Sequence, residues 1–511
     1  MSVTSEPSLP GSTPAGPSSP TDAGSGEPTG AAAGPLESGS AEAAGPPAGP
    51  GPRYAPSPCH AVDPDTPIRL PPGPRQGRLA QTVAFLNDPF DSTLANQGTF
   101  GGVWKMSLLS NRDAFCATSH PDHIRAIFAA AAEAPAINHE SPLRLILGQN
   151  SVLTLSGPRH MQQRKLLLPP FHGDAVANYV QMIEAVTAAE IDRWVPGQTF
   201  ALAPRMQAVT LEVIMRGVLG IHERGGWHTP ERRFRELIRT FLSASNTSLY
   251  PFIEMANFRA REAQGPIRWM MEATDRELYK LIAKRRAAGE DAGANDVFSL
   301  LLAARDEDGQ PMTDAELRDE LMTLILAGHE TTANSLAWTF ERLVRSPAAY
   351  ATLREQTRHG DPAAARAYVE ATIHEGMRRR PVISFVVRRV QKPWRFGEYV
   401  VPAQTPVALS IVGVHHRPDV YADPASFRPE RFLDAEGRFQ KPGTYTWIPF
   451  GGGIRRCLGA TLAMAEQRVV LEQIAKRVDF ALTDAPGERA RQRNVTSIPA
   501  DGGTVTVDAR H

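Results

Sequence analysis

The sequence predicts a mainly α-helical protein with small β-sheets, and three observations support that fold class. Apolar residues recur at helical spacing through residues 173–305, and one helical pattern runs from Thr313 to about Arg345, just before Pro347. Alternating, strand-like segments are short and bounded by glycine or proline. Of the 511 residues, 42% are hydrophobic and 22% are charged, which is ordinary for a globular protein with a large core.

Residues 1–62 differ in composition from the rest, and we expect them to form a disordered tail before a folded domain of residues 63–511. They are mostly Pro, Gly, Ala, Ser and Thr, and they bury too little to offset their chain entropy. Five acidic residues against Arg53 alone give this tail a net charge of −4, and the rest +4. It has neither the basic and apolar regions of a signal peptide nor the arginines of a transit peptide.

Features of the whole chain exclude other classes of protein. The formal net charge is zero, so nothing global indicates a nucleic-acid partner. Cys59, Cys116 and Cys457 are the only cysteines; they cannot form a disulfide framework and they fit a reducing compartment. No run of about 18 apolar residues occurs, so we expect a cytoplasmic protein without a transmembrane anchor.

The first third of the folded part combines a hairpin, a helix and a long loop. Residues 102–109 alternate and are followed by a second short apolar segment at 113–117, which predicts a β-hairpin. Ser119 is a candidate N-cap for a helix with Pro121 in its first turn. Residues 133–150 have the composition of a long loop with apolar side chains at 143 and 145–147.

The longest predicted helix starts at a capping box, Thr313-x-x-Glu316, and spans roughly 50 Å at ~1.5 Å per residue. Its middle reads Ala327-Gly-His-Glu-Thr-Thr332. Gly328 weakens the helix there, and Thr331 can turn its hydroxyl to the carbonyl of Ala327. We therefore predict a locally opened turn, at which Glu330 and Thr331 place an acid beside an alcohol.

The last third of the chain contains several strand signals. Residues 381–387 are apolar and precede Arg388 and Arg389. Residues 399–409 resemble a hairpin that turns at 402–403, and a second hairpin is predicted around the sequence Asp501-Gly-Gly503.

A glycine-rich loop, Phe450-Gly-Gly-Gly-Ile-Arg-Arg-Cys-Leu-Gly459, leads into a helical pattern and carries Cys457. At a helix start the thiolate, which is the metal-binding form, is expected to be favoured. Gly453 and Gly459 leave space for a large flat ligand. The loop lacks the lysine of a phosphate loop and the third glycine of a dinucleotide fingerprint, and a zinc site would need further cysteines. A single thiolate with space beside it for a large flat ligand suggests haem.

The pattern Phe450-x-x-Gly453-x-Arg455-x-Cys457-x-Gly459 resembles the haem-binding signature of the cytochrome P-450 monooxygenases. The Ala327–Thr332 string resembles the oxygen-activating groove of that family's I helix, and residues 157–171 resemble its C helix. The resemblance covers about residues 69–511 and implies the cytochrome P-450 fold, with haem b between the long I helix and the cysteine-ligand loop at the start of the L helix.

The resemblance also implies roles for single residues. Cys457 would be the axial ligand of the haem iron, and Glu330 and Thr331 would deliver protons during oxygen activation. His160, Arg164, Arg455 and one of Arg388 and Arg389, with Arg388 favoured, would hold the propionates, and Phe450, Gly453 and Gly459 would shape the loop. Glu375 and Arg378 are three apart on a helix and would form a buried network with Arg431.

We therefore expect a haem-thiolate monooxygenase that inserts one oxygen atom of O2 into a lipophilic substrate, with fatty acids and terpenoids slightly favoured. Electrons would come from separate donors, a ferredoxin or flavodoxin with its reductase, that dock on a basic face at Arg455, Arg456 and Arg468. We expect a monomer. A peroxide-driven peroxygenase or isomerase and a haem sensor without chemistry are the alternatives. The predicted pocket lining is apolar: Leu143, Leu145, Ile146, Leu249, Phe252, Leu326, Ala327, Val382, Ile383, Phe385 and Ile498.

Overall fold

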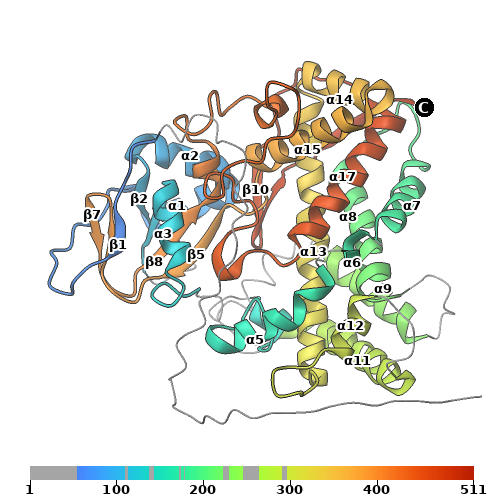
Figure 1. Cartoon of the computed structure of the whole chain (residues 1–511), viewed down its shortest axis with the longest axis horizontal. Helices are drawn as coiled ribbons and strands as arrows, with labels where there is room; N and C mark the ends of the chain where they lie inside the picture. Colours follow the sequence, from blue (N-terminus) through green and yellow to red (C-terminus); the bar gives the residue numbers. More distant parts are fainter. Residues whose placement is uncertain are drawn as a thin grey trace, which may run out of the picture. The chain divides into compact units, whose positions relative to one another are not determined.

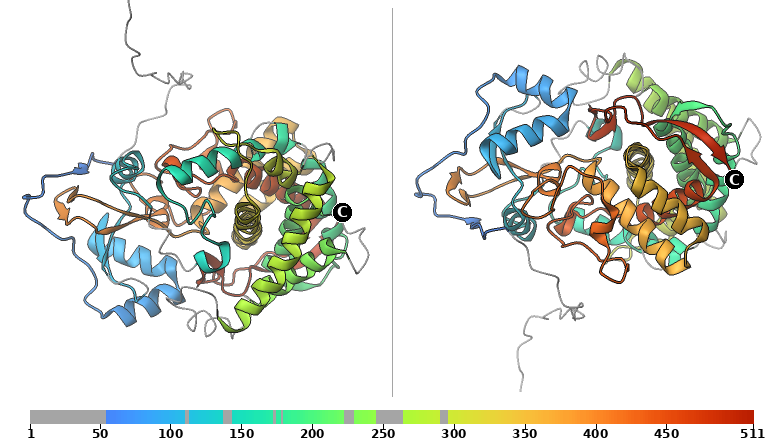
Figure 2. Two further views of the ribbon diagram at one scale, coloured as in Figure 1. Left: turned by 90° about the horizontal axis from the view of Figure 1, so that it is seen from below. Right: turned by 90° about the horizontal axis from the view of Figure 1, so that it is seen from above.

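Helix α13 (Asp314–Leu343) runs through the middle of the helical part of the molecule, and Figure 2 shows it end on with other helices around it. The structure is a computed structural model that describes residues 54–109, 113–136, 143–171, 174–177, 179–221, 229–244, 264–289 and 296–511. All of these belong to one unit, Pro52–His511. The predicted capping box is present: the Glu316 N–H donates to Thr313 Oγ1 (3.2 Å) and the Thr313 N–H donates to Glu316 Oε2 (2.9 Å).

The other described helices lie before and after α13 in the chain (Figure 1), and α1 (Arg78–Asn87) and α2 (Pro89–Phe100) were not predicted from the sequence. Those before α13 are α1, α2, α3 (Pro121–Ala129), α4 (Arg144–Leu147), α5 (Gly157–Leu167), α6 (Asp174–Ala177), α7 (Val180–Ile191), α8 (Leu202–Val213), α9 (Pro230–Ala244), α11 (Gly265–Ala288) and α12 (Val297–Ala303). A π-helical turn, Ile214–Val218, extends α8. After α13 come α14 (Pro347–His359), α15 (Pro362–Arg379), α16 (Ile411–His415) and α17 (Ala460–Arg477).

The strands are short and form four small sheets among the described residues. One sheet has the order β2 (Val103–Met106), β3 (Phe115–Thr118), β8 (Pro406–Ser410) and β5 (Phe385–Arg389), with β3 and β8 parallel. A second contains β1 (Cys59–Ala61), β6 (Trp394–Phe396) and β7 (Tyr399–Val401), and a third contains β4 (Thr199–Ala201), β12 (Thr504–Arg510) and β9 (Val478–Phe480). The fourth is the antiparallel pair β10 (Ala490–Arg493) and β11 (Thr496–Pro499).

The hairpin predicted at residues 102–117 is confirmed by the antiparallel pairing of β2 with β3, but the two later hairpins are wrong. β7 pairs with β6 while β8 pairs with β3 and β5, so the chain changes sheets at the 402–405 turn. Gln404 has φ +66° there, a conformation that favours glycine. Likewise, β11 pairs with β10 and β12 pairs with β4 and β9, because consecutive left-handed glycines, Gly502 and Gly503, redirect the chain between sheets.

Three further boundaries differ from the predictions. β1 pairs with β6, so residues 54–62 belong to the folded part and the domain begins before residue 63. The N-cap of α3 is His120, whose side chain accepts from the Asp122 N–H, rather than Ser119. The predicted 133–150 loop contains the short helix α4, while its residues 137–142 lie outside the described part of the chain.

Two apolar clusters meet along α13. Leu336, Phe340 and Leu343 in its C-terminal half pack with residues of α7, α8, α14, α15 and α17. Leu317, Leu321 and Ile325 in its N-terminal half pack with residues of α9, α11 and α12. Gly328 lies between the two halves, and a Cβ there would come within 3.0 Å of Ile214 Cδ1, so a glycine lets α13 approach the π-helical turn. Of the helices described, none has the length and apolar character needed to cross a lipid bilayer.

Helix α17 contains an unusual side chain, Glu466. It is 4% exposed, and its Oε1 has no hydrogen-bond partner among the described residues. Burial raises the pKa of this carboxyl from 4.5 to about 8, so it is protonated in the native protein at neutral pH.

We predict that the Glu466→Gln variant becomes more stable relative to the parent protein as the pH rises from 5 to 8. Below the pKa of the unfolded state, the carboxyl is protonated in both the folded and the unfolded protein. Between that pKa and the pKa of the folded state, the carboxyl ionises only in the unfolded protein. The free energy of unfolding therefore falls across this window by at most about 5 kcal/mol. The midpoint of thermal unfolding against pH measures the effect. Glu472→Gln, an exposed neighbour paired with Lys476, is the control; parallel pH profiles for the Glu466 variant and the parent would contradict the prediction.

Candidate active site

The loop that carries Cys457 is closed by its own backbone. The Cys457 N–H donates to the Phe450 carbonyl (3.0 Å) and the Arg456 N–H donates to the Gly453 carbonyl (3.0 Å). Gly453 has φ +64°, and a Cβ there would lie 2.7 Å from the Phe128 carbonyl of α3, so helix packing as well as conformation requires glycine. A Cβ at Gly459, by contrast, would meet nothing within 4 Å, which leaves space next to the sulfur.

The Cys457 thiol lies deep in the protein yet keeps accessible surface. Burial raises its pKa, while a hydrogen bond from the Gly459 N–H and the charges of Arg456 and Arg164 lower it. The net shift is upward, so the expectation that the helix start alone favours the thiolate is wrong for the free side chain. Bound metal would deprotonate it outright.

Three arginines and a histidine come together from three elements, and we call them the cationic group because the arginines carry its charge. His160 and Arg164 lie on α5, Arg388 lies on β5, and Arg455 belongs to the cysteine loop. Burial, followed by the charges of Arg455, Arg164 and Arg388, lowers the pKa of His160 to about 4. Burial and the charges of Arg388 and Arg164 lower the pKa of Arg455 to about 10. The structure thus brings together the four residues that the sequence assigned to the propionates.

This cationic group fits a dianion better than it fits any protein partner described. None of the charges that act on His160, Arg388 or Arg455 is a carboxylate. His160 Nδ1 is buried and has no hydrogen-bond partner within the described ranges. Buried like charges repel strongly unless a counter-ion joins them. The two propionates of haem would supply that counter-charge, so the residues present fit the cofactor.

The surroundings of Arg388 and Arg389 show which of the two arginines belongs to the cationic group. The Arg388 side chain is 8% exposed, its guanidinium lies over the Phe128 ring at 5.6 Å, and its charge acts on both His160 and Arg455. Arg389 points the other way, where its Nη1 donates to the Gln404 carbonyl (3.1 Å) near the surface. The geometry therefore favours Arg388 for the cationic group.

The second part of the candidate site is the middle of α13. Thr331 Oγ1 donates to the Ala327 carbonyl (2.7 Å), which confirms the predicted bond, and Ala327 is exposed although it lies in the middle of a largely buried helix. Glu330 does not join its neighbour Thr331 in a hydrogen bond that the structure records. Its Oε1 instead accepts from Arg493 Nε (2.7 Å) and Thr496 Oγ1 (2.8 Å) of the β10–β11 pair.

Sequence reasoning missed Arg493 and Thr496. Their only signal is an arginine and a threonine on either side of the turn in Arg493-Asn-Val-Thr496, and no local rule connects that turn to a helix more than 160 residues earlier. Their bonds draw the Glu330 carboxylate towards the hairpin.

The predicted pocket residues lie on segments that meet α13. The Trp338 indole donates to the Ser497 carbonyl (3.0 Å) and the Ser497 N–H donates to the Val382 carbonyl (2.6 Å), so the segments carrying Val382 and Ile498 lie against the helix. Phe385 begins β5, and Leu145 and Ile146 are on α4. Leu249 and Phe252 lie outside the described residues.

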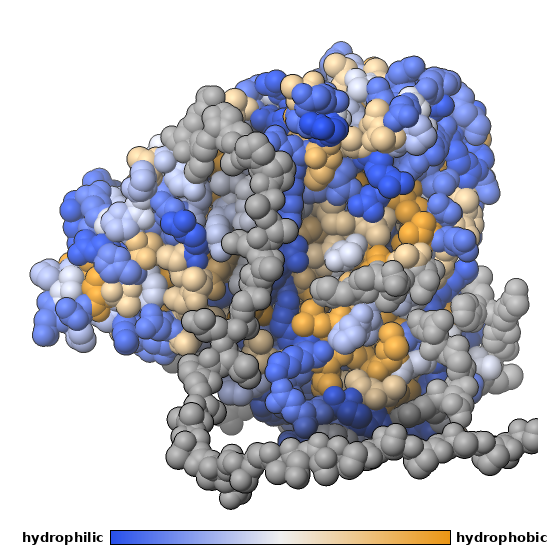
Figure 3. Space-filling model, in the orientation of Figure 1, coloured by the Kyte–Doolittle hydropathy of each residue, from blue (hydrophilic) through white to orange (hydrophobic). Residues whose placement is uncertain are grey.

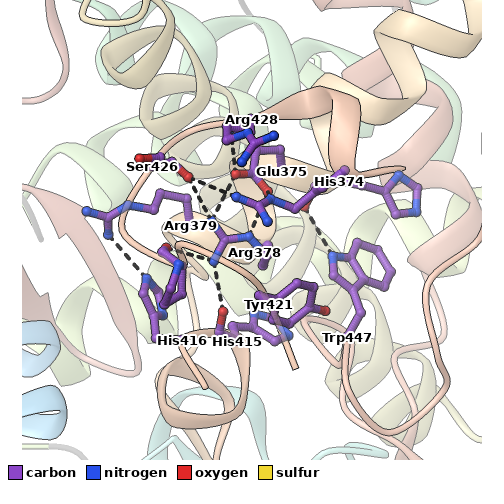
Figure 4. A network of polar contacts seen from close by, with 12 residues as sticks. His374, Glu375, Arg378, Arg379, His415, His416, Tyr421, Ser426, Arg428 and Trp447 are labelled. Carbon is purple, nitrogen blue, oxygen red and sulfur yellow. Dashed lines mark hydrogen bonds and ion pairs between the residues drawn. The ribbon is translucent and has the colours of Figure 1, made fainter. Parts of the chain in front are cut away.

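A buried ionic network stands behind the cysteine loop (Figure 4). The Glu375 carboxylate accepts from Arg378 Nε (2.7 Å) and Nη2 (2.9 Å), and Arg431 Nε is 3.0 Å away, so the three predicted members are in contact. Glu375 and Arg378 are 0% exposed. The Trp447 indole donates to the His374 carbonyl (3.1 Å), which ties the start of the cysteine loop to the same helix, α15.

The expected basic docking face is only partly present. Arg455 turns inward and donates to the Val152 carbonyl (3.0 Å), and Arg468 is paired with Glu370 (2.7 Å), which leaves Arg456 exposed. Ile454 beside it is 43% exposed. Figure 3 shows an apolar area on this side of the molecule, over the region where Figure 1 draws α6 and the lower part of α17. Of the three arginines expected on this face, the described loop thus presents Arg456 to solvent with Ile454 beside it.

Comparison with known proteins identifies the family. The sequence profile described as "Cytochrome P450" matches residues 69–503. The chain belongs to the cytochrome P450 family. Its relatives include cytochrome P450 135B1 of Mycobacterium tuberculosis, 36% identical over 86% of this chain and 92% of that protein, and cytochrome P450 138 of the same species, 34% identical over 87% and 97%.

Solved P450 structures share the fold. A cyanobacterial P450, CYP120A1, solved with retinoic acid bound, has a TM-score of 0.70 at 22% identity and covers 87% of this chain and 100% of its own. The haem domain of cytochrome P450DA has the same TM-score at 20% identity, covering 86% and 97%. Family membership makes this P450 a haem-thiolate monooxygenase that binds protoporphyrin IX with iron.

We predict that Glu375→Gln destabilises this P450 by about 3–5 kcal/mol, because two buried guanidinium groups lose their counter-charge. Chemical denaturation monitored by circular dichroism measures the loss. The matched control is Glu370→Gln on the same helix, whose partner Arg468 is 36% exposed; it should cost less than about 1 kcal/mol. Equal losses in the two variants would show that the network contributes nothing beyond an ordinary ion pair.

Proposed function

We propose that this P450 inserts one oxygen atom of O2 into a lipophilic small molecule by hydroxylation or epoxidation, with Cys457 as the axial ligand of the haem iron. The observation that carries this proposal is the cationic group of His160, Arg164, Arg388 and Arg455 next to a single thiol in a closed glycine loop. The substrate classes that we favour are fatty acids and terpenoids, because the predicted lining is apolar. We further propose a cytoplasmic monomer that receives electrons from a separate ferredoxin or flavodoxin and its reductase.

Each wall of the site has a separate task in this proposal. The loop supplies the thiolate, and the cationic group holds the propionates and orients the porphyrin ring. When bound, haem supplies the oxygen-activating chemistry that a cysteine ligand promotes. On α13, the Thr331 hydroxyl, already turned to the Ala327 carbonyl, is placed to hold a water and pass a proton. Apolar side chains around Val382 and Phe385 would exclude bulk water.

Glu330 is proposed as the acid of the proton relay, although its carboxylate is held by Arg493 and Thr496. A relay through Glu330 therefore requires that this side chain leave the hairpin or pass protons while bound to it. The same observation favours a second candidate function, a peroxide-driven haem-thiolate enzyme or isomerase, since such an enzyme needs no proton relay.

The proposal is tested first by the ligand. We predict that the purified chain contains haem and that its reduced form with carbon monoxide gives the red-shifted absorption band of a thiolate-ligated haem. Cys457→Ser should abolish this band, while Cys116→Ser, at a buried free cysteine on β3, should leave it unchanged. A colourless protein, or an unaltered band in the Cys457 variant, would overturn the assignment.

Substitutions on α13 distinguish the two candidate functions. We predict that Thr331→Ala lowers product formed per O2 consumed by about tenfold and that Glu330→Gln slows turnover by ~10²-fold, the range typical of general acid–base groups. Turnover is measured with a surrogate ferredoxin and reductase. Thr339→Ala on the same helix, whose hydroxyl also donates to the carbonyl four residues back (2.8 Å), is the control for helix disturbance. Undiminished coupling in both variants, together with product formation from hydrogen peroxide, would favour the peroxide-driven enzyme.

A further inference from the structure

One helical turn lies between α13 and the cysteine loop and is bonded to both. Within it, the Thr154 and Leu155 N–H groups donate to the Ser151 carbonyl (2.9 Å each). A single helical turn leaves N–H groups unpaired at its start and carbonyls unpaired at its end. Here the N–H groups meet carboxylates of α13, and the carbonyls meet Arg455. We call residues Gly148–Ser156 the bridging turn.

At its first end the bridging turn is held by consecutive acidic residues of α13. The Val152 N–H donates to Glu320 Oε1 (2.8 Å). The Asn150 N–H and side-chain amide both donate to Asp319 Oδ2 (2.9 and 3.0 Å). Thr323 Oγ1 donates to Ser151 Oγ (2.7 Å). A buried backbone N–H requires a partner, and these side chains supply it.

The sequence at Gly148 is fitted to the same contact. Gly148 has φ +86°, and a Cβ added there would lie 2.0 Å from Asp319 Oδ1. No side chain can occupy this position while the Asp319 carboxylate stays in place. The Thr154 hydroxyl also donates to the Gly148 carbonyl (2.9 Å), which closes the turn on itself. The bridging turn and the acidic pair are therefore complementary in shape as well as in hydrogen bonding.

At its other end the bridging turn holds Arg455. Arg455 Nη1 donates to the Val152 carbonyl (3.0 Å), and Nη2 donates to the Leu155 carbonyl. Val152 thus connects α13 directly to the cysteine loop, because its N–H is bonded to Glu320 and its carbonyl is bonded to Arg455. Helix α5, which carries His160 and Arg164, begins immediately after the turn, at Gly157.

Glu320 differs from Asp319 and Glu316 because it forms no ion pair with any residue that the structure describes. It is 0% exposed, and its Oε2 has no hydrogen-bond partner in the part of the chain that is described. Burial, then the charges of Asp319 and Glu316, raise its pKa well above the usual range. A neutral, buried carboxyl makes no ion pair. The contribution of Glu320 at this position is therefore the hydrogen bond that it accepts from the Val152 N–H.

We propose that Glu320 is a positioning residue for Arg455: it fixes the bridging turn, and the carbonyls of the turn aim the guanidinium at the haem propionates. The inference rests on the proposed role of Arg455. A half-buried arginine with several donors, and with no carboxylate among the charges that act on it, needs fixed acceptors to keep one orientation. The same turn sets the start of α5, so Glu320 also influences how His160 and Arg164 are presented.

The test is the rate at which haem leaves the holoenzyme for excess apomyoglobin. Glu320→Leu should release haem about tenfold faster than the parent, the effect expected for one lost buried hydrogen bond. Glu320→Gln keeps the acceptor oxygen and should stay within about twofold of the parent, because the carboxyl is neutral. In an Arg455→Gln background, Glu320→Leu should change the rate by less than about twofold, because the two residues act through one contact.

A second measurement does not depend on haem. Hydrogen exchange of the peptide covering residues 148–156 should accelerate in Glu320→Leu and in Gly148→Ala, which displaces Asp319, and should be unchanged in Glu320→Gln. If exchange accelerates but haem release is unchanged, the turn is held by Glu320 and the link to Arg455 is wrong. Additive effects of Glu320→Leu and Arg455→Gln would overturn the proposal, and so would equal rates in the Leu and Gln variants. Absence of haem from the parent protein would instead contradict the proposed function.

Discussion

The constraint on which the rest of this structure depends is a cluster of basic side chains, buried or half-buried, with no carboxylate among the charges that act on His160, Arg388 and Arg455. Burial lowers the pKa of Arg388, and burial together with the charges of Arg388 and Arg164 lowers the pKa of Arg455. A protein can maintain such an arrangement only if rigid elements hold the side chains and a counter-ion relieves the repulsion. The two propionates of haem would supply negative charge here, so under the proposed assignment the cofactor would be part of the electrostatic balance of the fold.

The rigid elements are recruited from distant parts of the sequence. The cysteine loop is backed by the Glu375–Arg378 network on α15, and Trp447 ties it to the same helix. The bridging turn connects the loop to α13, which is itself fixed by apolar clusters on both halves. Gly328 lies between these clusters and packs closely against Ile214. Next to it, the Thr331 hydroxyl donates to the Ala327 carbonyl of the same helix. Helix α13 is nevertheless continuous from Asp314 to Leu343, so the predicted locally opened turn does not interrupt it, and packing on both halves holds the helix through this position.

What the sequence predicted well was local. The capping box at Thr313, the bond from Thr331 to Ala327, and the closeness of Glu375 to Arg378 each depend on residues a few positions apart, for which helix geometry is sufficient. What it could not predict was non-local. Strand β7 pairs with β6, which directly precedes it, whereas β8 joins the sheet of β3, a strand from the first third of the folded part. The turn residues between β7 and β8 do not encode that choice.

The candidate site shows the same division. The identities of Cys457, His160 and Arg164 followed from a family pattern, and the structure places them together. The upward shift of the Cys457 pKa was not predictable, because it depends on how much protein surrounds the sulfur. The orientation of Glu330 was equally hidden, since Arg493 and Thr496 are brought to it by the sheet topology.

These two misses have a common physical meaning. In each case a side chain expected to be ready for chemistry is held in a state that is not the reactive one: the free thiol is disfavoured as a thiolate, and the acid is engaged by a hairpin. Metal binding changes the first, because an iron–sulfur bond outweighs the burial of the anion. A ligand that contacts the β10–β11 pair near Ile498 would act on the second, because Ser497 of that strand is bonded to both α13 and the Val382 segment. The hydrogen bonds of Ser497 thus link α13, the Val382 segment and the strand that carries Ile498, so these parts of the candidate site are mechanically connected by the fold.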